Sequence, residues 1–208
     1  MKRHLLRVAI LWAALGIIVG LFSLGGVKMS HLTRDPAQLM HTPVYKGFLS
    51  NMGALIWCAA AVAPFFASFL ARNADRPFLR WIALINLVLM ADDFFLLHDV
   101  VFPLYLHLPE KLMVAFHPAA LGIYLVYYRR RLLRGTEWRL LALAVGVLGI
   151  SQAVDFNLLP GGIDVEDGFK LGGMIVWTYY WCLTAWQIVM RRIECAESGA
   201  VNPSPVER

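Results

Sequence analysis

Long apolar stretches separated by short polar ones dominate the hydrophobic pattern of the chain. Six such stretches run over residues 8–24, 48–71, 78–97, 112–128, 140–156 and 169–190. Each is long enough to cross a bilayer as a helix, and none shows the ten-residue alternation of a membrane β-barrel strand. The pattern predicts an all-α bundle of six transmembrane helices, forming one domain over residues 1–193. The polar tail at 194–208, rich in proline and serine, is predicted to be disordered and cytoplasmic.

Composition agrees with the apolar pattern. Of the 208 residues, 59% are hydrophobic and 16% are charged, whereas a soluble domain has roughly 45–50% and about 25%. The mean hydropathy is +0.61. These values exclude a soluble globular protein and leave no room for a separate soluble domain. The three cysteines form no CxxC or Cys/His pattern, so neither a zinc finger nor a disulfide framework is expected.

The placement of lysine and arginine predicts the orientation in the membrane. If the N-terminus is cytoplasmic and the six helices alternate, 14 of the 19 basic residues fall on the inner side. They are Lys2, Arg3, Arg7, Arg72, Arg76, Arg80, Arg129, Arg130, Arg131, Arg134, Arg139, Arg191, Arg192 and Arg208. Both termini are therefore predicted to be cytoplasmic, in the inner membrane of a bacterium. The basic residues are spread over all inner loops, so no nucleic-acid partner is expected.

The first apolar stretch also allows another interpretation. Lys2, Arg3 and Arg7 precede an apolar run, which is the pattern of a signal peptide. The run is long for the hydrophobic region of a signal peptide, and this favours a retained first helix.

Ionisable residues on four of the predicted helices reach a similar depth in the outer half of the membrane. Counting 1.5 Å per residue, Asp92 and His117 both lie about 9 Å below the outer boundary, Asp155 about 6 Å and Lys170 about 4–5 Å. Buried charges in a membrane protein face the bundle interior or a wet cavity. We therefore expect these four side chains to line one cavity.

The residue types in this region suit a metal-assisted reaction. Carboxylates mixed with histidine are typical zinc ligands, so Asp92, His117, Asp99 and Asp155 are predicted to bind a divalent metal, with zinc preferred. Further candidates for catalysis and for the site are Glu110 as general base, Asp93, Lys170, His98, Glu166 and Asp167. His98 lies off the Asp92 face of a straight helix and ranks below His117. Ordinary alternatives also exist: Asp99 and Glu110 as boundary residues, Glu166 and Asp167 as a solvated loop with a helix cap.

Two sequence segments resemble an uncharacterised family of small bacterial multispanning membrane proteins. The first is Asp92-Asp93-Phe94-Phe95-Leu96-Leu97-His98-Asp99, and the second is Glu166-Asp167-Gly168-Phe169-Lys170. The resemblance covers roughly the second half of the chain and implies no activity. The chain is also distantly similar to membrane hydrolases of the alkaline ceramidase type, which hold zinc with Asp, Ser and His from several helices. It departs from them in having six predicted spans rather than seven and no histidine pair in the last helix.

Three functions remain compatible with the sequence. The first is a metal-assisted hydrolase whose substrate is a lipid or another amphiphile. The second is a proton- or cation-coupled carrier, for which the inner half of the bundle offers few polar residues. The third is a non-catalytic scaffold or subunit whose polar residues hold helices together. In each case membrane lipid is an expected partner, and no feature of the sequence predicts an oligomeric state.

Overall fold

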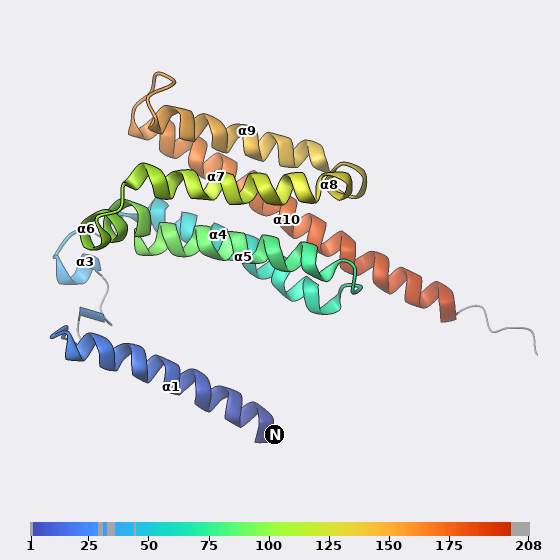
Figure 1. The fold of residues 1–208 in the computed structure, drawn as a ribbon, viewed down its shortest axis with the longest axis horizontal. Helices are drawn as coiled ribbons and strands as arrows, with labels where there is room; N and C mark the ends of the chain where they lie inside the picture. The colour runs from blue at the N-terminus through green and yellow to red at the C-terminus, as the bar shows by residue number, and fades with distance from the viewer. Residues whose placement is uncertain (1, 29–30, 33–35, 44, 201–208) are drawn as a thin grey trace, which may run out of the picture. The chain divides into compact units, whose positions relative to one another are not determined.

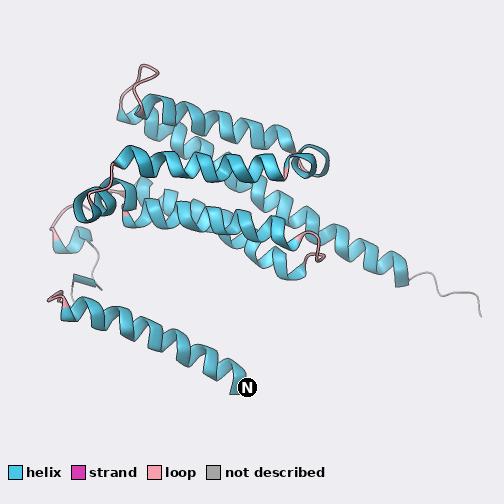
Figure 2. Cartoon of the chain, viewed as in Figure 1, coloured by secondary structure: helices cyan, strands magenta, loops and turns pink. Residues whose placement is uncertain are grey.

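The computed structural model describes residues 2–28, 31–32, 36–43 and 45–200, and this part of the chain is helical without a strand (Figure 2). For some helical residues, among them 110–114 and 197–200, only the backbone is described. The helices are α1 (Lys2–Leu24), α3 (Pro36–Leu39), α4 (Phe48–Leu70), α5 (Arg76–Phe95), the π-helix η1 (Leu97–Val101), α6 (Phe102–Leu106), α7 (Glu110–Tyr127), α8 (Arg129–Gly135), α9 (Trp138–Asp155) and α10 (Ile163–Ala200). The all-α class is thereby confirmed.

Each of the six predicted apolar stretches falls on a separate helix, from α1 through α4, α5, α7 and α9 to α10. The predicted ends agree with the observed ends within about two residues, except in α1 and α10. There the helices extend beyond the apolar stretch into polar residues.

Membrane-spanning character is strongest in two helices. By length and composition, α4 and α9 are apolar enough to cross a bilayer, and α5 with η1 and α6 forms a third candidate that is bent by 57°. Shorter apolar helices cover Trp12–Leu24 and Ala115–Tyr127. The helices are therefore compatible with a membrane protein, while the arrangement of six spans stays a prediction.

The chain divides into two compact units, Met1–Phe48 and Leu49–Arg208, where the sequence predicted one domain over residues 1–193. The predicted tail also differs from what is observed, since α10 continues through Ala200 rather than ending near residue 193. Residues 194–200 contain no proline, and the first one after α10 is Pro203. No proline therefore interrupts α10 up to Ala200. Residues 201–208 lie outside the described part.

The core of the second unit is formed by aromatic side chains of α10 and α5. Trp177, Tyr180 and Trp181 on α10 are fully buried, and Trp181 packs against Phe78 of α5 with ring centroids 5.8 Å apart. Small residues complete the contacts on α4 and α9, where Ala60 and Ala144 are fully buried. This packing fixes the relative positions of α4, α5, α7, α9 and α10, which Figure 1 shows running alongside one another.

The loops predicted to face the cytoplasm gather at one end of this unit. Arg131 forms an ion pair with Asp75, Arg192 donates to the Leu70 carbonyl, and Arg191 donates to the Gly135 carbonyl over 3.2 Å. Consequently, the C-terminal end of α5 and the N-terminal end of α7 lie at the opposite end of the unit. The candidate site residues belong to that opposite end.

Candidate functional site

A break in the α5 helix creates the central feature of the site. Leu96 adopts a left-handed conformation, with φ 51° and ψ 44°, and ends α5 at Phe95. A non-glycine residue rarely adopts this conformation, because its Cβ is crowded there. The chain then continues as the short π-helix η1, a form that is frequent at functional sites. The break turns His98 back toward Asp92, six residues earlier in the chain.

Asp92 is buried, with 5% of its surface exposed. Its Oδ1 accepts a hydrogen bond from the backbone N–H of His98 over 3.0 Å, and its Oδ2 lies 2.6 Å from Nδ1 of the His98 ring. The other ring nitrogen of His98, Nε2, lies 3.2 Å from Oδ1 of Asp99. Both nitrogens of His98 therefore face carboxylates. The sequence placed His98 below His117 as a site candidate because that prediction was based on a straight helix through this segment.

His117 of α7 approaches the same carboxylate from the neighbouring helix. Its Nε2 lies 3.6 Å from Oδ2 of Asp92, which is close enough for an ion pair but longer than a hydrogen bond. We refer to Asp92, His98, Asp99 and His117 as the Asp92 cluster. Glu110, the predicted general base, begins α7, but its side chain lies outside the described part of the structure.

Asp93 and Lys170 form a separate ion pair, with Lys170 Nζ 2.7 Å from Asp93 Oδ1. They line a cavity of about 360 Å³ between α4 and α10, together with Ser50, Gly53, Asp164 and Asp167. We call it the α4–α10 cavity. Adjacent residues on a helix point about 100° apart. Asp92 therefore faces α7 while Asp93 faces α4 and α10, and the predicted single site is divided into two.

The remaining predicted residues lie on α9 and at the start of α10. Asp155, predicted as a metal ligand, is exposed and accepts a hydrogen bond from Gln152 over 3.0 Å. Partial burial raises the pKa of Glu166, and the nearby carboxylates of Asp155 and Asp167 raise it further. Within the described residues, no group of three or more His, Cys, Asp or Glu side chains has the arrangement of a metal site. Of the four predicted ligands, Asp92 and His117 are brought together directly, and Asp99 reaches Asp92 only through His98.

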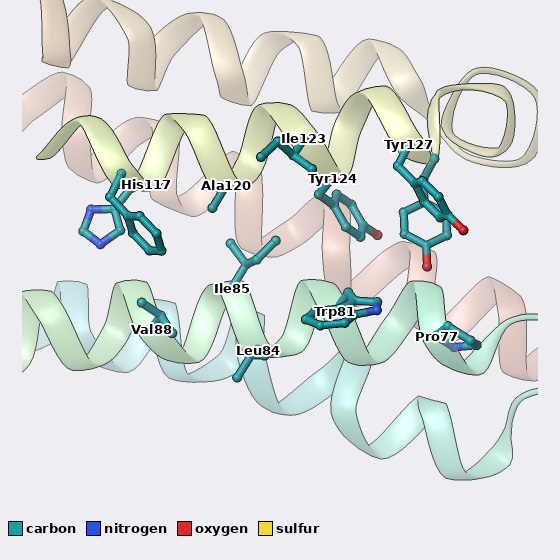
Figure 3. Close-up of a pocket in the computed structure, with 12 residues that line it drawn as sticks. Pro77, Trp81, Leu84, Ile85, Val88, His117, Ala120, Ile123, Tyr124 and Tyr127 are labelled. Carbon is teal, nitrogen blue, oxygen red and sulfur yellow. The ribbon is translucent and has the colours of Figure 1, made fainter. Parts of the chain in front are cut away.

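An apolar groove of about 540 Å³ runs between α5 and α7 and ends at His117. Figure 3 shows His117 at one end of the groove, with Pro77 and Tyr127 at the other. The lining between them is almost entirely apolar: Trp81, Leu84, Ile85, Val88, Phe116, Ala120, Ile123, Tyr124 and Tyr128. We call it the α5–α7 groove. The sequence did not predict it, because its lining residues have the same apolar pattern as residues that pack against another helix.

The comparisons with known proteins identify a family. Residues 5–184 match the model of a domain of unknown function, DUF8692, and the chain belongs to this family. No curated protein and no solved structure matches the chain significantly. The family assignment agrees with the uncharacterised family expected from the sequence and carries no activity with it.

Proposed function

We propose that this member of the DUF8692 family is a membrane protein that binds a lipid-like amphiphile in the α5–α7 groove and hydrolyses it at the Asp92 cluster. One observation carries the proposal: His117 lines the apolar groove and, at the same time, lies 3.6 Å from the buried Asp92 carboxylate. A mostly apolar cavity with a few polar groups at one end is the usual form of a site for such ligands.

The size of the groove suits an alkyl chain. From His117 to Tyr128, α7 advances by about 16 Å, at 1.5 Å per residue. An extended alkyl chain along this length contacts apolar side chains on both helices, and burial of its surface stabilises the complex. The polar end of the ligand then reaches His117, the polar residue at that end of the groove.

The Asp92 cluster provides groups for acid–base chemistry at that polar end. As water attacks the acyl carbon of an ester or amide, His117 takes a proton from the water and returns it to the leaving oxygen or nitrogen. The Asp92 carboxylate stabilises the protonated form of His117. His98 is a positioning residue, since its backbone and its ring both hold Asp92 in place.

A bound divalent metal is a second form of the same proposal. An ion bonded at about 2.0–2.2 Å to a histidine nitrogen and a carboxylate oxygen sets these atoms roughly 3.4 Å apart. The separation of 3.6 Å between His117 Nε2 and Asp92 Oδ2 is close to this value. Asp92 and His117 would hold the ion, His98 would hold the Asp92 carboxylate in place, and the metal would activate water.

The proposed setting is the bacterial inner membrane, with six spans and both termini in the cytoplasm. The arginines that gather at one end of the second unit support this orientation, because basic residues favour the cytoplasmic side. The Asp92 cluster then lies toward the outer face of the membrane.

The buried polar residues deeper in the bundle favour this proposal over a carrier. Asn86 is fully buried, donates to the Ala60 carbonyl over 2.9 Å and accepts from Trp177 Nε1 over 2.8 Å. Its amide is committed to holding three helices together. Asn86 is therefore not available to pass protons or ions inward from Asp92.

Photocrosslinking tests the binding part of the proposal. A single-chain fatty acyl ester with a photoactivatable group in its chain should label α5 and α7 of the detergent-solubilised protein. Ala120→Trp, which fills the middle of the groove, should reduce the labelling at least fivefold. Ala119→Trp is the matched control, since Ala119 is exposed on the same helix and does not line the groove. Equal labelling in both variants would reject the groove as the binding site.

Release of free fatty acid from the same probe tests the reaction. His117→Ala should reduce release by a factor of about 10² or more, the scale of general acid–base catalysis, while labelling of the groove is retained. Ala120→Trp should reduce both. If the wild type is labelled but releases no product from ester or amide probes, hydrolysis is wrong, and a carrier or a scaffold that binds lipid takes its place.

A further inference from the structure

A second cavity lies at the other end of α7, where this helix passes into α8. It has a volume of about 410 Å³. Its lining is a continuous segment: Val126, Tyr127, Tyr128, Arg129, Arg130 and Arg131. We call it the α8 cavity. Three consecutive arginines beside two tyrosines give it a basic wall next to an aromatic one.

Arg131 is committed to the fold. It pairs with Asp75, donates to the Ala74 carbonyl over 3.2 Å, and places its guanidinium carbon 4.4 Å from the centre of the Phe78 ring. These contacts attach the start of α8 to the loop before α5. The cavity wall is therefore fixed in position, and the charge of Arg131 is already balanced by Asp75.

Arg129 and Arg130 differ from Arg131 in this respect. Both are exposed, and within the described part of the chain neither is paired with a carboxylate. A guanidinium group binds phosphate oxygens through two parallel hydrogen bonds, so two adjacent ones favour a phosphate ligand. Asp75 pairs with Arg131, so its charge is not available to balance Arg129 and Arg130.

The α8 cavity adjoins the α5–α7 groove. Tyr127 and Tyr128 line both of them. An anionic head group beside Arg129 and Arg130 is thus next to an apolar channel that accepts an acyl chain. Free phosphate would use only the basic half of this arrangement, whereas a phospholipid uses both halves.

From this geometry we infer that the α8 cavity binds an anionic phospholipid, with its phosphate on Arg129 and Arg130 and one acyl chain entering the groove past Tyr127 and Tyr128. The head-group site lies at the opposite end of α7 from the proposed reaction at the Asp92 cluster, and only the acyl chain shares the groove with the proposed substrate. It stands whether or not that reaction occurs. In the proposed orientation it faces the cytoplasmic leaflet, whose anionic lipids attract basic segments.

Thermal unfolding of the full chain in neutral detergent tests this site. Phosphatidylglycerol should raise the midpoint by several degrees, while phosphatidylcholine and inorganic phosphate at equal concentration should have at most a third of that effect. The double variant Arg129→Gln/Arg130→Gln should lose the effect of phosphatidylglycerol. It should keep the wild-type midpoint without lipid, because neither side chain has a partner to lose within the described residues.

A matched double variant distinguishes a specific lipid site from a general attraction of anionic lipid to positive charge. Arg134→Gln/Arg139→Gln removes the same charge from the same end of the unit without touching the cavity lining, and should keep the response to phosphatidylglycerol. Equal loss in both double variants would overturn the inference, as would equal stabilisation by phosphatidylcholine or by phosphate alone. Labelling of the groove by the single-chain ester should persist in Arg129→Gln/Arg130→Gln, so failure here is distinguishable from failure of the proposed hydrolase.

Discussion

At the scale of single residues, the chemistry centres on the buried Asp92 carboxylate. Its two oxygens face three nitrogen atoms, two from His98 and one from His117. An isolated buried carboxylate is costly, and hydrogen bonds together with histidine rings offset that cost. The contacts that stabilise the Asp92 charge also hold this carboxylate beside His117. Asp93, one residue later, is instead paired with Lys170 and serves a different cavity.

The metal form of the proposal makes a prediction at this scale. Zinc at a hundredfold excess over its Kd should stabilise the protein by about 2.7 kcal/mol. For a chain of this size, that corresponds to roughly 5–10 °C in the thermal midpoint. The gain should shrink as the pH falls, because metal ligands must be deprotonated to bind. Scanning fluorimetry with added zinc, manganese or calcium measures it.

The variants for this experiment follow from the geometry. Asp92→Asn and His117→Ala should each abolish the zinc effect. Asp164→Asn should leave it intact, because Asp164 lines the α4–α10 cavity and not the Asp92 cluster. If zinc, manganese, calcium and a chelator all leave the wild-type midpoint unchanged, the metal form is wrong, and the metal-free acid–base form remains.

At the scale of elements, α9 and α10 pack closely because glycine leaves room between them. A Cβ atom built on Gly173 would lie 2.7 Å from the Leu148 side chain and 3.0 Å from the Leu148 backbone nitrogen. The backbone of α9 cannot yield as a flexible side chain would. Small residues allow this kind of close approach in membrane helices.

Replacing this glycine tests the packing. Gly173→Ala should destabilise the protein by about 1–3 kcal/mol through overpacking, visible as a fall of several degrees in the thermal midpoint. Gly172→Ala is the control from the adjacent position, where the nearest atom to a new Cβ is Val147 Cγ1 at 4.0 Å. That variant should unfold at the wild-type temperature or above. A midpoint for Gly173→Ala equal to that of Gly172→Ala would contradict the close packing.

At the scale of the whole molecule, the two ends of the second unit have different chemistry. One end holds the arginines that donate to loop carbonyls and to Asp75. The other holds the Asp92 cluster and the α4–α10 cavity. In the proposed orientation, this difference separates lipid attachment on the cytoplasmic side from chemistry on the outer side.

Reporter fusions test that orientation. Fusions after Arg72, Arg134 and Arg192 should all report the cytoplasm, because each site follows a basic segment at the same end of the unit. A fusion after Gly161, between α9 and α10, should report the opposite side. A periplasmic result at any of the first three sites would contradict the six-span scheme.

The apolar pattern alone determined where the six long helices are. A helix satisfies its own backbone hydrogen bonds, so its position depends on a local run of apolar residues, and all six runs became helices. The sequence also identified Asp92, His117 and Lys170 as unusual, because charge within an apolar run is costly wherever the helix packs.

Only the tertiary structure decided which of these residues meet. The left-handed Leu96 ends α5 and brings His98 onto Asp92, an outcome that straight helical spacing had disfavoured. The rotation of α5 against α7 and α10 set Asp92 and Asp93 in different sites, since adjacent residues on a helix point about 100° apart. The groove beside His117 likewise depends on how far apart α5 and α7 pack. Those contacts join residues far apart in the sequence, and a local pattern of apolar positions does not encode them.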